Sequence, residues 1–262
     1  MVQNHPFLLS FMKTNFKLFL ILLVFPVLLP AQNTYPEWFL FPGKYSDIVT
    51  GYARRGGSTV SDAETTWCAF KSCVAMGTLY RYQDMDQVHS DYYYNYSPDE
   101  LKKIKGNLHP VKGSFTALNM ITQDFIEAFS TNPDLKVSIK KIHVKTINRP
   151  GWLNKYPFYA ENGYYYGIGE YTSRYNKIDA WKKAEDLAIF NIMTGLAVQY
   201  HTVMIETQNN RQDTMEKVQA QKVKYLLRNI RVMERWMDIE KDMVYVLIQI
   251  PKNDVISPLL NK

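Results

Sequence analysis

The apolar positions of this chain follow a helical spacing most clearly in two stretches, residues 61–80 and 176–194. In the first, the sequence SDAE at residues 61–64 has the form of a capping box, in which Ser61 and Glu64 satisfy backbone amides at a helix start. Behind it, apolar or small residues repeat every three or four positions and form one stripe: Ala63, Trp67, Phe70, Val74 and Gly77. This pattern predicts an amphipathic helix over the whole stretch.

The second stretch predicts a helix that lies close to a sheet. One face of residues 176–194 carries mainly small or flat apolar side chains: Ala180, Trp181, Ala184, Leu187, Ala188 and Ile192. Alanine has so short a side chain that these positions let the helix approach a neighbouring strand closely. After Leu187 the helix is apolar nearly all round, so we expect it to be covered on two sides.

Several other segments have the composition or alternation of regular structure. Strands are expected at residues 47–53, 137–147, 164–170, 228–236 and 243–250, the last two joined as an antiparallel hairpin about residues 238–242. A short helix is expected to begin at Ser97-Pro98, and residues 115–129 have helical spacing through Phe115, Leu118, Ile121, Phe125 and Phe129. Residues 196–206 look extended, and residues 209–224 are polar and predicted to be helical.

Two parts of the chain align with each other when the sequence is shifted by 117 residues. The shift places Asp62 on Asp179 and Met76 on Met193, and each predicted helix follows a strand that contains glycine. This shared order predicts a duplication. We therefore expect an α+β fold of two tandem related units, each a small, mainly antiparallel sheet backed by one or two helices.

The N-terminal segment has the features of a secretory signal peptide. Residues 1–31 contain two lysines followed by an apolar run at residues 18–29, which is too short and too interrupted for a membrane-spanning helix. We expect cleavage after Ala31, with translation starting at Met1 or Met12. No other stretch approaches a membrane span, so the mature chain is predicted to be periplasmic, outer-membrane-associated or secreted.

The predicted organisation places the turn NRPG at residues 148–151 between two units. The expected order after the signal at 1–31 is an aromatic linker at 32–44, a first unit at 45–150 with an insertion at 83–113, a second unit at 151–252 and a tail at 253–262.

Charge and cysteine content argue against two functional classes. Without residues 1–31, the chain has 29 basic and 25 acidic residues, a net charge of +4 spread along its length. That distribution favours an ordinary solvated surface over nucleic-acid binding. Cys68 and Cys73 would lie on diverging faces of one predicted helix, out of reach of a disulfide, which favours small buried hydrophobes over a redox or metal pair and leaves a redox role open.

No group of residues has the spacing of a catalytic, cofactor or metal site. Gly167 and Gly169 resemble the beginning of a dinucleotide-binding loop, but the third glycine is missing. The histidines share no ligand spacing. Asp238, Glu240 and Asp242 could collect a calcium ion, but their loop lacks the glycine and terminal glutamate of an EF-hand, which favours solvated turn carboxylates. We predict no catalytic residue, no cofactor and no metal ion.

Short motifs occur in a characteristic order in the chain: PEW, GxG, DAx3Ax3A and RWxD followed by VYVL. They lie at residues 36–38, 167–169, 179–188, 235–238 and 244–247. In this order they resemble the bacterial lipoprotein-20 family, mainly over residues 157–252. The resemblance implies a small antiparallel sheet backed by two helices in an envelope-associated protein, a group that includes surface lipoproteins and flagellar outer-ring assembly proteins. It brings no enzymatic residues, and the chain lacks the lipidated cysteine of a lipoprotein.

These observations favour a non-enzymatic envelope-associated or secreted protein that binds another envelope or surface protein. The alternative is a glycan- or peptidoglycan-binding module that uses a tyrosine cluster in the insertion: Tyr92, Tyr93, Tyr94 and Tyr96. Tyrosine offers a rigid ring with a polar tip, which suits such ligands, although the same rings often cover apolar surface. A third hypothesis, a hydrolase assembled from distant residues, predicts a deep pocket with convergent polar groups. The partner and the oligomeric state, a homo-oligomer included, are left open.

Overall fold

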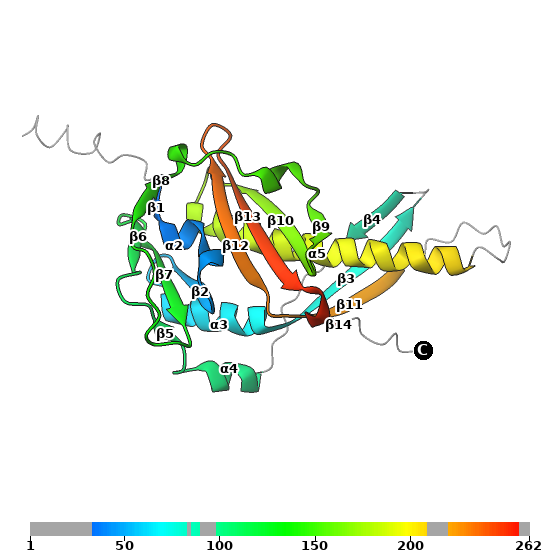
Figure 1. Cartoon of the computed structure of the whole chain (residues 1–262), viewed down its shortest axis with the longest axis horizontal. Helices are drawn as coiled ribbons and strands as arrows, with labels where there is room; N and C mark the ends of the chain where they lie inside the picture. Colours follow the sequence, from blue (N-terminus) through cyan, green and yellow to red (C-terminus); the bar gives the residue numbers. More distant parts are fainter. Residues whose placement is uncertain (1–32, 83–84, 90–97, 209–219, 257–262) are drawn as a thin grey trace, which may run out of the picture. The chain divides into compact units, whose positions relative to one another are not determined.

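The computed structural model describes residues 33–82, 85–89, 98–208 and 220–256 (Figure 1). The described residues from Thr34 onward belong to one compact unit. The predicted signal peptide at residues 1–31 lies outside the described residues. The fold is α+β, as predicted: helices pack on several small sheets, and every strand pair that the structure describes is antiparallel.

The first half of the chain is built around a strand, a helix and a second strand. These are β2 (Ile48–Ala53), α3 (Thr59–Lys71) and β3 (Ser72–Tyr82). β2 pairs with β7 (Asp124–Ser130), which also pairs with β5 (His109–Pro110) and β6 (Thr116–Asn119). Helix α3 begins so close to β2 that a Cβ on Gly51 would lie 2.2 Å from the Thr59 carbonyl oxygen.

The second half repeats that order with β10 (Tyr164–Thr172), α5 (Lys177–Gln208) and β11 (Ala220–Arg228). β10 lies in a four-stranded sheet of order β12-β13-β10-β9, made with β9 (Phe158–Glu161), β12 (Arg231–Asp238) and β13 (Met243–Pro251). The predicted close approach is present. A Cβ on Gly167 or Gly169 would lie 2.0 or 1.9 Å from the carbonyl oxygens of Ala188 and Ala184.

A further sheet joins the two halves. Its order is β14-β11-β3-β4, with β4 (Met85–His89) and β14 (Val255–Ile256) at its edges. β3 and β11, the strands that follow the two helices, pair along residues 72–80 and 220–228. A strand–helix–strand order therefore occurs in both halves, but the residue correspondence of the sequence shift fails at Met76, which lies in β3 whereas Met193 lies in α5. The division into units at residues 45–150 and 151–252 and their common ancestry stay predictions.

The remaining elements are short. They are β1 (Thr34–Pro36), α2 (Glu37–Leu40), η2 (Pro42–Lys44), α4 (Pro98–Ile104), β8 (Lys141–His143), η3 (Val144–Thr146), η4 (Gly151–Asn154) and η5 (Lys252–Asp254). The segment expected as an aromatic linker at residues 32–44 supplies part of the core, because Trp38, Phe39 and Leu40 have no exposed surface.

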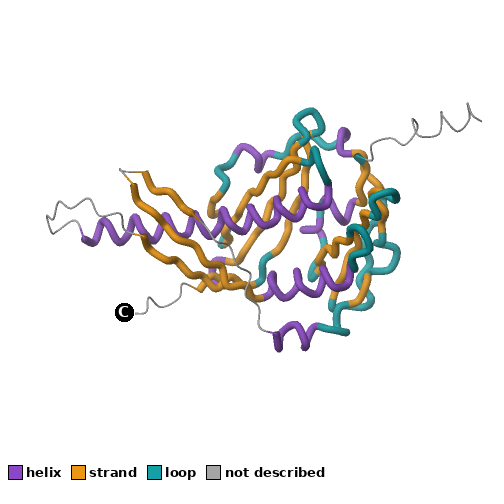
Figure 2. Tube along the Cα trace, turned by 180° about the vertical axis from the view of Figure 1, so that it is seen from behind, coloured by secondary structure: helices purple, strands orange, loops and turns teal. Residues whose placement is uncertain are grey.

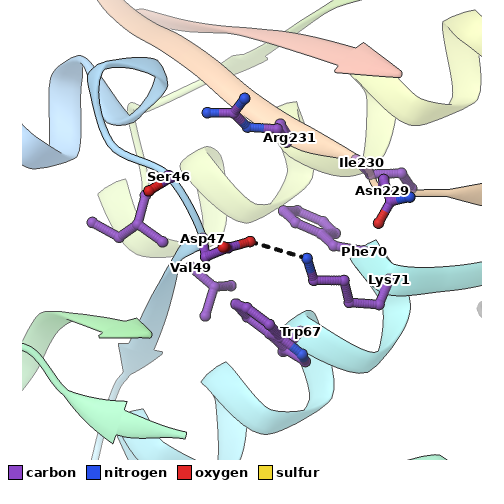
Figure 3. A pocket seen from close by; sticks show the side chains of 10 residues that line it. Ser46, Asp47, Val49, Trp67, Phe70, Lys71, Asn229, Ile230 and Arg231 are labelled. Carbon is purple, nitrogen blue, oxygen red and sulfur yellow. Dashed lines mark hydrogen bonds and ion pairs between the residues drawn. The ribbon is translucent and has the colours of Figure 1, made fainter. Parts of the chain in front are cut away.

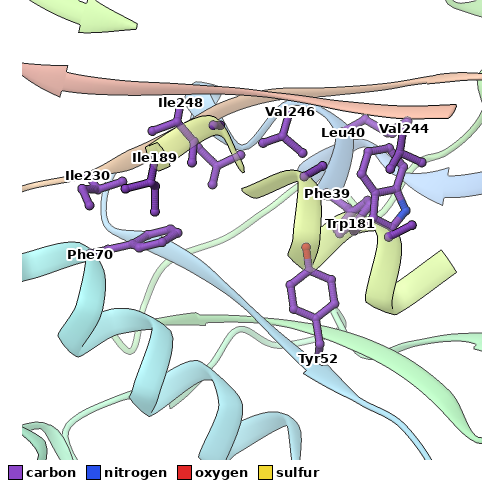
Figure 4. Packing of buried hydrophobic residues seen from close by; sticks show 14 of the residues in the cluster. Phe39, Leu40, Tyr52, Phe70, Trp181, Ile189, Ile230, Val244, Val246 and Ile248 are labelled. Carbon is purple, nitrogen blue, oxygen red and sulfur yellow. The ribbon is translucent and has the colours of Figure 1, made fainter. Parts of the chain in front are cut away.

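The main hydrophobic core lies between α5, the sheet β12-β13-β10-β9 and the α2 segment (Figure 4). The rings of Phe39 and Trp181 meet edge to face with centroids 5.5 Å apart. Ile189 and Ile192 of α5 and Val246 and Ile248 of β13 are fully buried in the same cluster, which places the apolar face of the helix against the sheet, as predicted.

Several predicted elements are confirmed. The strands at residues 47–53 and 164–170, the start of the second helix and the hairpin of residues 228–250 correspond to β2, β10, α5 and β12–β13. The short helix after Ser97-Pro98 is α4.

Several segments differ from the prediction. Helix α3 ends at Lys71, so Val74, Met76 and Gly77 lie in β3, where pairing with β11 suits a stretch with many β-branched and aromatic residues. Residues 115–129 form β6 and β7 in place of a helix. Only Lys141–His143 of residues 137–147 is a strand. Residues 220–224 belong to β11, while residues 209–219 lie outside the described part.

Helix α5 is longer than predicted and runs through residues 196–206 to Gln208. Gly195, the residue after the predicted helix end at 194, lies inside the helix. A Cβ at Gly195 would lie 2.0 Å from Cδ1 of Phe158, so its smallness allows β9 to pack on α5. Among the described residues, no helix combines the length and the apolar character needed to cross a membrane.

Candidate functional site

A hollow of about 210 Å³ lies where the start of β2, the end of α3 and the β11–β12 turn meet (Figure 3). It is lined by Ser46, Asp47, Ile48, Val49, Trp67, Phe70, Lys71, Asn229, Ile230 and Arg231. The β11–β12 turn lies in the second half of the chain and the other two segments in the first, so the fold brings these residues together.

The inner wall of the hollow is apolar and firmly built. Trp67 and Phe70 are three positions apart on α3 and therefore share one face of the helix. Val49 and Ile230 are each 4% exposed. The amide of Ile230 donates to the carbonyl of Phe70 at 2.8 Å, which satisfies a carbonyl at the helix end and holds the turn against α3.

The rim of the hollow is charged. Lys71 Nζ lies 3.2 Å from Asp47 Oδ1 and 4.6 Å from the centroid of the Trp67 ring. Arg231 Nη2 donates to the Tyr45 carbonyl at 3.0 Å. Two cations and one carboxylate therefore surround an aromatic wall, which leaves the rim with a net positive charge.

The hollow is small, and its lining is partly aromatic and partly charged. Small-molecule sites usually enclose about 300–1,000 Å³, so this volume is closer to that of one amino-acid side chain. The polar side chains in its lining are Ser46, Asp47, Lys71, Asn229 and Arg231.

A second polar group of interest is a buried network around Arg235, whose side chain is 1% exposed. Its guanidinium donates to Glu185 Oε1 at 2.6 and 3.1 Å, to the Phe39 carbonyl at 2.6 Å and to Thr50 Oγ1 at 3.2 Å. Tyr52 donates its hydroxyl to the same Glu185 oxygen at 2.6 Å. The network links β2, α2, α5 and β12 inside the core and is closed to solvent.

The shifted pKa values of Tyr52 and Arg235 keep the phenol neutral and the guanidinium charged at neutral pH. Burial raises the pKa of Tyr52 well above its ordinary value, and the positive charge of Arg235 offsets this only in part. Burial alone would lower the pKa of Arg235, but Tyr52 and Glu185 more than compensate, so the guanidinium remains charged. We interpret the network as a structural connection.

The two aspartates that the sequence shift aligns make reciprocal ion pairs. Asp62 at the start of α3 pairs with Lys182 of α5, and Asp179 at the start of α5 pairs with Arg54, which follows β2. Asp62 Oδ2 also accepts a hydrogen bond from the Tyr52 amide at 2.9 Å. Both carboxylates sit in first helical turns, where the helix dipole favours negative charge.

The candidate residues from the sequence have different outcomes. Tyr92, Tyr93, Tyr94 and Tyr96 lie outside the described residues. Cys68 is buried in α3, but Cys73 lies in β3, so the two cysteines do not share a helix.

In the β12–β13 turn, considered in the sequence as a calcium site, one carboxylate stabilises the turn itself. Asp238 Oδ1 accepts hydrogen bonds from the amides of Glu240 and Lys241 at 3.1 and 3.2 Å, which closes the β12–β13 turn. Within the described part of the chain, no group of three or more histidine, cysteine, aspartate or glutamate residues is placed to hold a metal ion.

A second tyrosine cluster lies on the β9–β10 hairpin and was not singled out from the sequence. The rings of Tyr159 and Tyr166 stack with centroids 4.8 Å apart and an interplanar angle of 8°. The hairpin turns at Asn162 and Gly163, with φ of 48° and 82°. An Asn-Gly pair between two tyrosine-rich stretches is the signal that could have found it. The stack is explained as a cross-strand pair that stabilises the hairpin.

Comparison with protein-family models, with curated proteins and with solved structures finds no match to this chain.

Proposed function

We propose that this chain is a non-enzymatic, exported protein that works by binding another protein of the cell envelope or cell surface. The observation that carries the proposal is the hollow at the end of α3, whose volume suits one side chain of a partner. In many protein interfaces, a few side chains that enter such hollows account for most of the binding free energy.

The lining indicates which partner side chain fits best. Trp67 and Phe70 offer aromatic surface, while Lys71 and Arg231 bring positive charge to the rim. A partner that inserts an apolar or aromatic side chain beside an acidic residue would satisfy both features. The expectation of export rests on the apolar segment at residues 18–29.

The test begins with capture of the partner from the native envelope, followed by its purification and a calorimetric measurement of Kd. Ser46 is exposed at the mouth of the hollow, so Ser46→Trp should block it without disturbing the core. Arg231→Glu reverses charge on the rim. We expect each change to weaken binding at least tenfold, because each removes part of a central contact.

Lys241→Glu provides the matched control, because this lysine side chain is 73% exposed on the β12–β13 turn, away from the hollow. It should change Kd by less than about twofold. If both hollow variants bind the partner as tightly as the wild type, the hollow is not the contact site.

The glycan alternative is tested separately. Replacing Tyr92, Tyr93, Tyr94 and Tyr96 with alanine should leave retention on immobilised peptidoglycan unchanged if the protein-binding proposal is right. Loss of retention with an unchanged circular dichroism spectrum would favour the glycan-binding module instead.

A further inference from the structure

The turn between β6 and β7 presents two large apolar side chains to solvent. Met120 is 70% exposed and Ile121 is 81% exposed. The conformation of this turn is well defined, because Asn119 Oδ1 accepts hydrogen bonds from the amides of Ile121 at 2.9 Å and Thr122 at 3.3 Å. Gln123 completes the turn with φ of 53°. Two apolar side chains are therefore held outward by an ordered turn.

Two other loops are tied to this turn. In the β2–α3 turn, the amide of Arg55 donates to the Thr122 carbonyl at 3.4 Å. Asp124, the buried first residue of β7, accepts a hydrogen bond from Asn176 of the β10–α5 loop at 3.3 Å and lies 3.9 Å from Arg54 Nε. Figures 1 and 2 show the three connections beside the starts of α3 and α5.

The same loops carry exposed positive charge. Arg55 and Arg174 are exposed, one on the β2–α3 turn and one on the β10–α5 loop. Next to Arg174, Tyr175 is 88% exposed. The carboxylate of Asp179, which is close to these loops, is already paired with Arg54. The surface thus combines an apolar tip with arginines.

We propose that these three loops, the β2–α3, β6–β7 and β10–α5 connections, form a membrane-contact surface. Met120 and Ile121 would enter the interfacial region of an anionic bilayer, while Arg55 and Arg174 bind its phosphate headgroups. Side chains that protrude into water on most sides are covered readily by a lipid surface, whereas a protein partner would need a matching hollow for them. Arginines close to an anionic surface add attraction that falls off within a Debye length.

This surface is separate from the hollow at the end of α3, called the Trp67 hollow from here on. The hollow lies at the C-terminal end of α3, and the three loops lie near its N-terminal end. Binding of a protein partner and contact with a membrane can therefore be tested one at a time, and either proposal can fail alone.

Vesicle sedimentation tests the proposal. The full-length chain and a chain that begins at Gln32 are compared, so that the apolar segment at residues 18–29 cannot account for the binding. Vesicles of phosphatidylethanolamine with phosphatidylglycerol should bind both chains, and vesicles of phosphatidylcholine should bind the shorter chain much more weakly. In the shorter chain, the double change Met120→Ser and Ile121→Ser should lower the partition coefficient at least tenfold. Arg55→Glu and Arg174→Glu should each lower it roughly fivefold, less so at high salt.

Tyr156→Ser is the matched control, because Tyr156 is 83% exposed before β9 on a different loop. It should leave the partition coefficient unchanged. A polarity-sensitive fluorophore attached through Met120→Cys, in a Cys73→Ser background, should shift to the blue on anionic vesicles, and one attached through Tyr156→Cys should not.

Two outcomes would overturn the proposal. One is that the shorter chain does not bind anionic vesicles, or binds them equally well after the serine changes. The other is that the serine changes abolish binding of the envelope protein captured by the Trp67 hollow and leave vesicle binding intact, which would make the β6–β7 turn a protein contact.

Discussion

Arg235 shows how one buried charge can make several elements depend on each other. Its only carboxylate partner among the described residues is Glu185, and the two side chains are 1% and 7% exposed. Glu185→Ala would leave a cation buried without a counter-charge. We expect it to lower the free energy of unfolding by about 3–5 kcal/mol, measured by urea denaturation.

Lys183→Ala is the control for that loss of charge pairing. Lys183 lies on the same helix, is 61% exposed and is 3.8 Å from Asp186. Exposed pairs of this kind contribute about 1 kcal/mol or less. A cost for Glu185→Ala no larger than that for Lys183→Ala would show that the network is not a structural connection.

The raised pKa of Tyr52 predicts a loss of stability at alkaline pH. Because the folded-state pKa lies above the unfolded value of about 10, the unfolded chain releases this proton first as the pH rises. The free energy of unfolding is therefore unaffected below pH about 10 and falls by up to about 1.4 kcal/mol per pH unit above it. Tyr52→Phe should reduce that slope in urea denaturation between pH about 10 and 11. The same change at Tyr175, which is 88% exposed, provides the comparison.

At the scale of elements, the glycines of β10 determine how closely α5 can approach. A methyl group on Gly169 would overlap the Ala184 carbonyl oxygen at 1.9 Å, and backbone cannot move aside cheaply. Gly169→Ala should therefore destabilise the fold by about 2–3 kcal/mol or more. Thermal and urea unfolding would measure it.

Gly151→Ala is the matched control, because an added Cβ there meets no atom within 4 Å. It should change stability by less than about 0.5 kcal/mol. Equal effects of the two alanine substitutions would mean that the helix–sheet distance is not limited by these glycines.

The elements that could be predicted from the sequence are those whose local pattern and tertiary surroundings agree. β10 and the start of α5 are clear in the sequence because alanines and glycines mark the two faces that meet. The predicted helix over residues 115–129 was wrong, because Ile121, counted in its apolar stripe, is a turn residue that faces solvent. Asp124, Ile126 and Ala128 are buried and the residues between them are less so, which is the two-residue period of a strand.

The boundary between α3 and β3 could not be predicted from the local sequence either. Val74 and Gly77 continue the apolar stripe of the helix, but β11, about 150 residues later, supplies a pairing partner for residues 72–80. A helix stripe and a buried strand can share the same apolar residues over a short stretch. The long-range partner therefore decides the structure.

At the scale of the whole molecule, the candidate site could not be predicted from sequence patterns, because its lining residues come from three segments. Trp67 and Phe70 were assigned correctly to an apolar helix face. That the face would border a hollow depends on the β11–β12 turn, whose Ile230 binds the end of α3. No spacing in the chain connects residues 46–49, 67–71 and 229–231.

The two halves of the chain should unfold together. They share the β3–β11 pairing, the reciprocal ion pairs of Asp62 and Asp179, and the Arg235 network. Cys68, which is 3% exposed in α3, becomes the only thiol after Cys73→Ser and reports on the first half, while the circular dichroism of α5 reports mainly on the second. In urea, thiol reactivity and ellipticity should change with the same midpoint, as expected for one cooperative transition. Reaction of Cys68 at a clearly lower urea concentration would show instead that residues 45–150 unfold as a unit of their own.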